Sequence, residues 1–287
     1  MKKEDISKIG IGTWKINYEN FDEDLDALIH SYKKGENYLS LYMMYNDGEV
    51  VKQMKHFLDK IDREKVFINA NLEPSIEKVE DVEKQLDEYL EILNIEYVDS
   101  LQVHDPFVSK IPLLDTYKEI KRLVEKGKVR YIGISNVNLE QLKEINDNIK
   151  IDFFEGVYNL ECKIYEDIGV LDYCEKNGIK FVCYQPLRRN RTANRNYPVL
   201  VELARKYNKT QNQIILNWII NEKRIMPLIK STNIERINEN IDSIDFKMDD
   251  TDYEKLNEFR SKEFDSVEID WQGKDGIPID QLANQFE

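Results

Sequence analysis

The chain has 287 residues, a formal net charge of −14 and three cysteines. This length suits a single α/β domain, and the negative charge argues against nucleic-acid binding by bulk electrostatics. No apolar run reaches the roughly 18 residues of a membrane span, and the start turns acidic at once, unlike a secretory signal. Cys162, Cys174 and Cys183 are not spaced as metal ligands, so we expect buried free thiols, no metal and a cytoplasmic location.

Short apolar runs alternate with amphipathic stretches along the chain. The runs, which we predict to be strands, occupy residues 9–13, 38–41, 66–70, 98–103, 131–134, 153–157, 181–184 and 225–229. Helices are predicted between them, for example over 21–34, 75–94, 112–126, 138–148 and 197–207. Strands that alternate with helices of about 10 to 20 residues form parallel βαβ units, and eight such units close into a barrel.

We therefore predict an α/β fold, a (β/α)8 TIM barrel, as a single domain over residues 1–287. The only shift in composition follows residue 261, so residues from about 262 to 287 are predicted to form an irregular tail. A dinucleotide-binding sheet would show GxGxxG after its first strand, and residues 10–14 do not complete that motif. Because barrel enzymes place their chemistry at the C-terminal ends of the strands, candidate site residues lie just after each apolar run.

Residues 230–240 have the composition of a phosphate-binding site. Lys230, Ser231, Thr232 and Arg236 surround what we predict to be a loop that enters a helix. Two cations, two hydroxyl groups and a helix N-terminus favour an anion, and arginine can bind it bidentately. The alternative interpretation is an ordinary capped, charged surface helix. Two other segments, GISN at 133–136 and CYQPL at 183–187, favour a nicotinamide-cofactor site.

Several motifs recur in one order along nearly the whole chain. They are GIGTW at 10–14, GENYL at 35–39, QVHDP at 102–106, GKVRYIGISN at 127–136, YNL at 158–160, YQPL at 184–187 and the segment 230–240. Each motif is weak alone, but their ordered occurrence is specific. On these motifs the chain resembles the aldo-keto reductases, as a short, bacterial-type member with an incomplete catalytic tetrad.

The resemblance implies that NADP(H) is the cofactor. In that family Ser135 and Asn136 would hold the nicotinamide carboxamide, and Tyr184 would stack on the ring. Glu155 stands where the family usually has a glutamine that contacts the carboxamide. A carboxylate there can accept but not donate a hydrogen bond, and its charge would favour the oxidised, positively charged ring. The segment 183–187, which carries Tyr184, adds Gln185 and Leu187 as further candidates for cofactor binding.

The family pattern also assigns the segment 230–240. Lys230, Ser231 and Arg236 would meet the 2′-phosphate of NADP(H), and Glu239 with Asn240 would meet the adenine. Thr232 belongs to the same set of candidates. Three arginines within residues 188–191 follow the strand that carries Tyr184, and they suit a polyanionic cofactor or an acidic substrate. The alternative for these arginines is a solvated loop.

The catalytic tetrad of the family is Asp, Tyr, Lys and His, and here only half of it is present. Tyr45 and His104 stand at the Tyr and His positions, whereas Ser40 and Asn71 replace the Asp and the Lys. The two losses belong together, because a buried carboxylate without its cation costs desolvation energy. A free tyrosine has a pKa of about 10 and needs a nearby cation to act as an acid near neutral pH. We therefore expect weak reduction of ordinary aldehydes.

These observations predict an NADP(H)-dependent oxidoreductase that transfers hydride to or from a specialised small-molecule carbonyl or alcohol. One alternative is an NADP(H)-binding protein without turnover that acts as a sensor or a partner subunit. A second alternative is a dehydratase or isomerase that uses the same pocket. No feature of the sequence indicates a particular protein partner.

Overall fold

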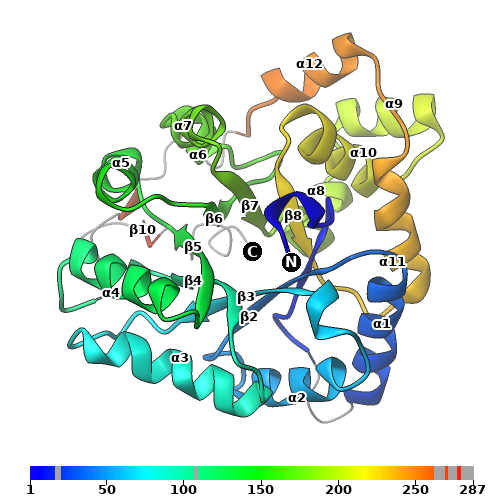
Figure 1. Cartoon of the computed structure of the whole chain (residues 1–287). Helices are drawn as coiled ribbons and strands as arrows, with labels where there is room; N and C mark the ends of the chain where they lie inside the picture. Colours follow the sequence, from blue (N-terminus) through cyan, green and yellow to red (C-terminus); the bar gives the residue numbers. More distant parts are fainter. Residues whose placement is uncertain (17–20, 107–108, 262–268, 271–276, 279–287) are drawn as a thin grey trace.

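The computed structural model describes residues 1–16, 21–106, 109–261, 269–270 and 277–278. Eight parallel strands close into a barrel in chain order, and β1 pairs with both β2 and β8. The strands are β1 (Gly10–Gly12), β2 (Tyr38–Tyr42), β3 (Phe67–Leu72), β4 (Val98–Val103), β5 (Val129–Ser135), β6 (Phe153–Val157), β7 (Lys180–Tyr184) and β8 (Met226–Ile229). Helices surround this ring (Figure 1). The predicted (β/α)8 TIM barrel is confirmed.

The helices follow the strands in alternation. They are α1 (Phe21–Lys33), α2 (Glu49–Leu58), α3 (Glu80–Leu93), α4 (Leu113–Glu125), α5 (Leu139–Asn148), α6 (Ile164–Asp167), α7 (Val170–Asn177), α8 (Arg191–Asn194), α9 (Pro198–Tyr207), α10 (Gln211–Asn217), α11 (Ile234–Ile241) and α12 (Asp250–Glu258). Helix α3 begins later than residue 75, because the Asp81 carboxylate accepts hydrogen bonds from the N–H groups of Glu77 and Lys78 and holds them in a turn. Within the described residues, no helix is long and apolar enough to cross a bilayer.

The interior of the barrel is built in two layers. Near the N-terminal ends of the strands, Tyr38 and Phe153 each pack against Phe67, with 5.1 Å between ring centroids in both pairs. Side chains alternate along a strand, so residues two positions further on also point inward. On these three strands those inward positions are polar: Ser40, Asn69 and Glu155. The aromatic layer fills the N-terminal end of the barrel, so the polar side chains lie toward its C-terminal end.

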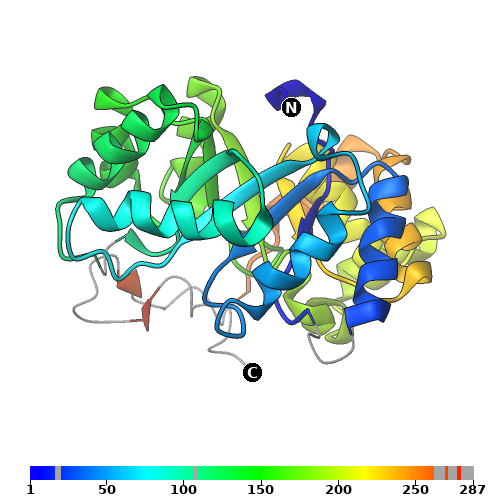
Figure 2. The ribbon, with the colours of Figure 1, turned by 60° about the horizontal axis from the view of Figure 1, so that its bottom comes forward.

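The two ends of the described chain lie at opposite ends of the barrel (Figure 2). The first residues, including the short helix Lys3–Asp5, cover the end from which the strands start. Of the tail predicted over about 262–287, the structure describes β9 (Ile269–Asp270) and β10 (Ile277–Pro278), which pair in parallel. The rest of that prediction lies outside the described residues.

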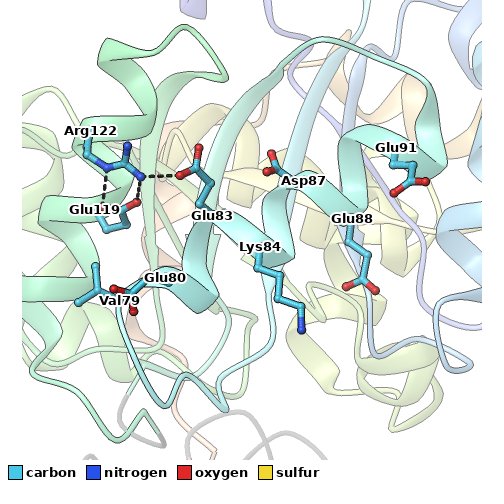
Figure 3. Close-up of a pocket in the computed structure, with 9 residues that line it drawn as sticks. All are labelled: Val79, Glu80, Glu83, Lys84, Asp87, Glu88, Glu91, Glu119 and Arg122. Carbon is cyan, nitrogen blue, oxygen red and sulfur yellow. Dashed lines mark hydrogen bonds and ion pairs between the residues drawn. The ribbon is translucent and has the colours of Figure 1, made fainter.

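A charged groove of about 750 Å³ lies outside the barrel, between α3 and α4 (Figure 3). Glu83 accepts hydrogen bonds from Lys126 at 2.7 Å, Lys128 at 2.9 Å and Arg122 at 2.6 Å. These bonds, with that of Lys126 the strongest, hold the pKa of Glu83 at about 2. Ionic contacts beside the groove therefore link α3 to α4 and to the segment that follows α4.

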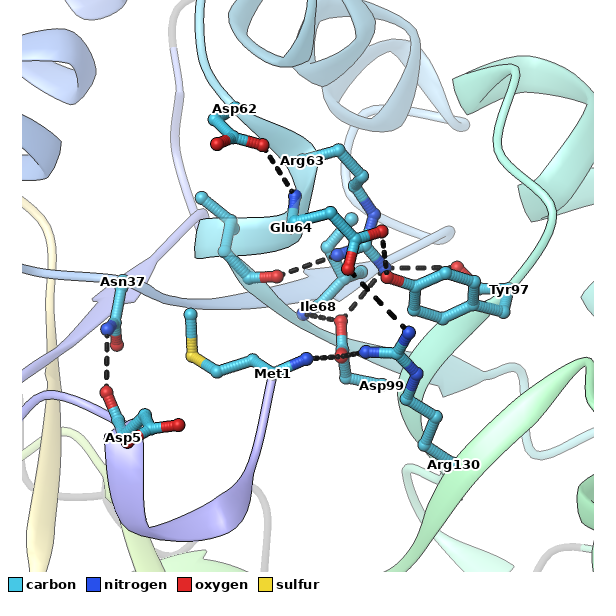
Figure 4. A network of polar contacts seen from close by, with 11 residues as sticks. Met1, Asp5, Asn37, Asp62, Arg63, Glu64, Ile68, Tyr97, Asp99 and Arg130 are labelled. Atoms are coloured by element: carbon cyan, nitrogen blue, oxygen red, sulfur yellow. Dashed lines mark hydrogen bonds and ion pairs between the residues drawn. The ribbon is translucent and has the colours of Figure 1, made fainter.

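Asp99, near the start of β4, connects β3, β5 and the turn before β3 at the N-terminal end of the barrel (Figure 4). Its carboxylate is fully buried and lies 2.8 Å from the Arg63 guanidinium and 3.3 Å from that of Arg130. It also accepts a hydrogen bond of 3.0 Å from the N–H of Ile68. Both guanidinium groups lie over the ring of Tyr97, at 4.5 and 3.7 Å from its centroid. Asp99 thus satisfies donors from β3, β5 and the turn before β3.

We expect Asp99→Ala to lower the free energy of unfolding by about 3 kcal/mol, because it leaves the N-terminal ammonium group and two partly exposed guanidinium groups without their buried carboxylate. The matched control is Glu64→Ala, which removes an exposed carboxylate that bonds Tyr97 and lies 3.9 Å from Arg130. The control should cost less than about 1 kcal/mol. Urea unfolding of both variants measures the difference, and equal losses would contradict the assignment of Asp99 as the centre of this network.

Candidate active site

A cavity of about 1240 Å³ lies at the C-terminal ends of the strands. It extends without interruption from the polar layer inside the barrel to the start of helix α11. Most of the site residues predicted from the sequence line it: Ser40, Tyr45, His104, Glu155, Tyr184, Gln185, Leu187, Lys230, Ser231, Arg236, Glu239 and Asn240. Four predicted site residues do not line the cavity. Asn71, Ser135 and Asn136 are buried, and Thr232 is exposed.

The floor of the cavity is a network of neutral donors around one carboxyl group. Ser40 Oγ donates to Glu155 Oε2 at 3.4 Å, and Asn69 Nδ2 donates to the same oxygen at 3.1 Å. Asn71 Nδ2 donates to Ser40 Oγ at 3.3 Å and to the carbonyl oxygen of Leu41 at 3.0 Å. Ser40 therefore bridges Asn71 and Glu155. Ser40 and Asn71, which the sequence predicts to replace the Asp and Lys of the tetrad, meet in one network, which contains no cation among the described residues.

Burial is the main influence on the Glu155 carboxyl. It raises the pKa of Glu155 to about 7, against hydrogen bonds from Gln102 and Ser40 that lower it. Gln102 also donates to Asn71 Oδ1 at 2.6 Å, which ties β3 to β4. The sequence analysis missed Asn69 and Gln102. The available signal was the polar residue at alternate positions of two otherwise buried strands.

The rings of Tyr45 and His104 both pack against the ring of Tyr42. The ring of Tyr42 is 5.2 Å from that of Tyr45 and 4.4 Å from that of His104. Burial, followed by the charges of Glu155 and Asp105, raises the pKa of Tyr45 above its ordinary value. This direction agrees with the expectation that the phenol lacks an activating cation. Tyr45 can donate a hydrogen bond in this setting, but it is a weak acid.

Asn136 connects Tyr184 to the loop that follows β4. Its φ is +56°, a left-handed conformation that asparagine tolerates. Asn136 Nδ2 donates to the carbonyl oxygen of His104 at 3.0 Å and to Asp105 Oδ1 at 2.8 Å. Tyr184 donates its hydroxyl hydrogen to Asn136 Oδ1 at 2.9 Å. These bonds fix the height and tilt of the Tyr184 ring at the cavity wall.

Ser135 provides a test of whether a nicotinamide fits. Its Oγ is buried and has no hydrogen-bond partner among the described residues. Its backbone is paired in register with Glu155 on the neighbouring strand. A buried hydroxyl group without a partner costs free energy, and an amide ligand offers both the donor and the acceptor that would satisfy it. The Ser135 hydroxyl therefore has the chemistry to bond a carboxamide, although Ser135 lies behind the residues that line the cavity.

The segment 230–240 forms a loop followed by α11, as predicted. Asn233 caps the helix by accepting from the N–H of Arg236 at 2.9 Å, and Ser231 Oγ accepts from the N–H of Asn233 at 3.1 Å. Lys230 lies 3.0 Å from the carboxylate of Asp24, which is almost fully buried. Arg236 is exposed and lines the cavity, whereas Thr232 is exposed but does not line it. Asp24 was missed by the sequence analysis, because it comes from α1, far away in the chain.

The far wall of the mouth is held by Glu239 and by a charged loop. Thr210 donates its hydroxyl hydrogen to Glu239 at 2.5 Å, which joins the start of α10 to the C-terminal half of α11. Arg188 is fully buried and lies 2.6 Å from the equally buried Glu161. Thr192 donates to Glu161 at 2.6 Å as well. Arg188 thus stabilises its own loop, so the expectation that all three arginines of residues 188–191 serve an anionic ligand needs correction.

The cavity, with its aromatic wall and its cationic mouth, lies at the C-terminal end of a (β/α)8 barrel. A model of the Aldo/keto reductase family matches residues 8–261, and the chain belongs to that family. "Aldose reductase B" of Dictyostelium discoideum is 28% identical over 283 residues, which is 89% of each chain. An "NADPH-dependent D-xylose reductase" of Meyerozyma guilliermondii is 24% identical, over 88% of this chain and 90% of its own. A thermostable aldo-keto reductase solved with epalrestat superposes with a TM-score of 0.82 at 27% identity, over 88% and 95% of the two chains.

The raised pKa of Glu155 predicts an unusual dependence of the free energy of unfolding on pH. Its pKa is about 7 in the fold against 4.5 as the ordinary value, so the unfolded chain binds fewer protons between these pH values. Stability from this group is therefore present below pH 4.5 and is lost as the pH rises through 7. We expect Glu155→Gln to raise the free energy of unfolding by about 2–3 kcal/mol at pH 8 and by less than about 1 kcal/mol at pH 5.

The control is Glu161→Gln. Hydrogen bonds from Thr192, Tyr197 and Arg188 outweigh burial and lower the pKa of Glu161. The stability that this carboxylate contributes to the fold is therefore present above the pKa that Glu161 has in the unfolded chain. This variant should be less stable than the parent at pH 8. Urea unfolding of the three proteins at both pH values measures the effects. A destabilised Glu155→Gln at pH 8 would contradict the picture of a carboxylate that lacks a cation.

Proposed function

We propose that the protein is an NADP(H)-dependent oxidoreductase that acts on a specialised carbonyl or alcohol substrate. The observation that carries this proposal is the single cavity, which joins Tyr45 and His104 to the donors around Lys230 and Arg236. The NADPH-dependent D-xylose reductase among its relatives supports the same cofactor. When bound, NADP(H) supplies or accepts the hydride.

The residues of this chain divide the remaining work. Ser135 would bond the carboxamide and Tyr184 would cover one face of the ring. Lys230 and Arg236 would bind the 2′-phosphate, and Asp24 would orient Lys230 through their ion pair at 3.0 Å. These groups bind and orient; none of them needs to transfer a proton.

Tyr45 and His104 both line the cavity and would donate hydrogen bonds to a substrate oxygen there. The cation of the family tetrad is replaced by the amide of Asn71, and burial raises the pKa of Tyr45. The site therefore offers orientation without strong acid catalysis. A substrate that is already activated, or that carries its own acid, suits this arrangement better than a simple aldehyde.

Binding without turnover is the second candidate function. The high pKa of Tyr45 and the neutral network below it favour this alternative. Both functions require NADPH to bind, and they differ in whether any substrate is consumed. Turnover of NADPH with a panel of aldehydes, ketones and imines separates them.

We expect NADPH to bind at least roughly tenfold more tightly than NADH, because each charge-assisted hydrogen bond to the 2′-phosphate contributes about 1.5–3 kcal/mol. Arg236→Ala should weaken NADPH and leave NADH nearly unchanged. The control is Arg224→Ala, which removes an exposed arginine that pairs with Glu175 and does not line the cavity. Quenching of tryptophan fluorescence measures the affinities of the parent and both variants for the two cofactors. Equal affinity for the two cofactors would contradict the assignment of the phosphate site.

A second prediction concerns the tetrad. Ser40→Asp combined with Asn71→Lys should raise the turnover of a reactive aromatic aldehyde by roughly tenfold or more, because it restores the cation beside Tyr45. The rate of NADPH oxidation between pH 5 and 9 measures this gain. The same double substitution in a Tyr45→Phe background is the control and should show no gain. Fast turnover by the parent protein that survives Tyr45→Phe would overturn the proposed role of Tyr45.

A further inference from the structure

Glu155 is the most deeply buried carboxyl group in contact with the cavity. It projects from the middle of β6, and its oxygen is bonded by the hydroxyl of Ser40 and the amide of Asn69. Both partners are neutral, so nothing bonded to this carboxyl compensates a negative charge. On the neighbouring strand the paired residue is Ser135, whose hydroxyl group lacks a partner among the described residues.

The ionisable groups that interact with the charge of Glu155 are Tyr38 on β2, Tyr45 in the loop after β2, and Cys183 on β7. Tyr184, His104, Asp105 and, at the mouth, Lys230 line the same cavity. Burial first, and then the charge of Glu155, raise the pKa values of Tyr38, Tyr45 and Cys183. Burial raises the pKa of Asp105 to about 6. Glu155 itself has a pKa of about 7, so it changes charge in the physiological range while the tyrosines and the thiol stay neutral.

We propose that Glu155 is a proton-linked group of the nicotinamide subsite, neutral beside the reduced ring and ionised beside the oxidised, cationic ring. This inference rests on the proposed function, because it requires the ring to lie against Ser135 and Tyr184. It gives Glu155 a role that the glutamine usual at this position cannot have, since an amide neither binds nor releases a proton in this range.

The physical reason is the difference of one charge between the two forms of the ring. A cation within about 4–6 Å lowers the pKa of a carboxyl by roughly one to three units. The neutral reduced ring only removes water from Glu155, which keeps the proton in place. Binding of NADP⁺ near pH 7 therefore releases the Glu155 proton to solvent, and binding of NADPH does not.

The sign of the pH dependence follows. NADP⁺ binds the ionised form better, so its affinity rises as the pH increases toward and above 7. NADPH binds the protonated form at least as well, so its affinity stays level or falls. Between pH 6 and 8 the ratio of the dissociation constants, NADP⁺ over NADPH, should fall roughly tenfold, as expected for one linked proton.

Isothermal titration calorimetry tests this directly. Each cofactor is titrated into the full-length protein at pH 7 in two buffers that differ in ionisation enthalpy, which gives the number of protons exchanged. We expect NADP⁺ to release about half a proton more than NADPH, because a group with a pKa near the working pH is half protonated. The 2′-phosphate is common to both cofactors, so its own proton exchange cancels in this difference. In Glu155→Gln the difference should vanish.

The matched control is Glu36→Gln. Burial also raises the pKa of Glu36 to about 7, but this residue lines a separate small cavity beside Lys230. Its loss should change the proton count for both cofactors by the same amount. An independent readout, the infrared C=O band of a protonated carboxylic acid, should disappear when NADP⁺ binds to the parent protein and persist with NADPH.

The outcomes separate the two proposals. Equal proton release for both cofactors, or a difference that survives in Glu155→Gln, would overturn the role of Glu155 and leave the proposed function standing. Failure of both cofactors to bind at any pH would overturn the proposed function and this inference together.

Discussion

The carboxyl of Glu155, buried without a cation, is the constraint on which the rest of the site depends. A carboxylate enclosed by neutral groups is costly, and burial accordingly raises the pKa of Glu155 to about 7. Ser40 lies 3.4 Å from it, so an aspartate at position 40 would bring two carboxyl groups into contact. Such a pair cannot ionise together without a cation between them. Serine at 40, asparagine at 71 and glutamate at 155 are therefore consistent choices.

This network depends in turn on how the barrel is filled. The packed rings of Tyr38, Phe67 and Phe153 occupy the N-terminal end of the interior and exclude water from it. The polar layer above is thus open on one side only, toward the cavity. A carboxyl in that position is shielded from bulk solvent, yet a ligand can reach it. The aromatic layer consequently determines both the stability of the barrel and the acidity of its site.

The sequence predicted the barrel and most residues around the cavity, because strand period and local motifs are properties of short segments. It did not predict partners that meet only after the barrel closes. Asp24 reaches Lys230 from α1, and Glu161 neutralises Arg188 inside a loop that looked simply basic. The start of α3 was placed too early, because the side chain of Asp81 competes for backbone N–H groups that a helical pattern alone assigns to the helix.

The charges around the cavity are arranged in a gradient. Lys230 and Arg236 lie at the mouth, whereas Glu155 and Asp105 lie at the inner end. The proposed cofactor has phosphate groups at one end and, when oxidised, a cationic ring at the other. An electrostatic match at both ends fixes its direction in the cavity, because the reversed molecule would set like charges together. If the proposed cofactor binds in this direction, the inner carboxyl groups would also influence which redox form is bound more tightly, and orientation and redox preference would depend on the same few side chains.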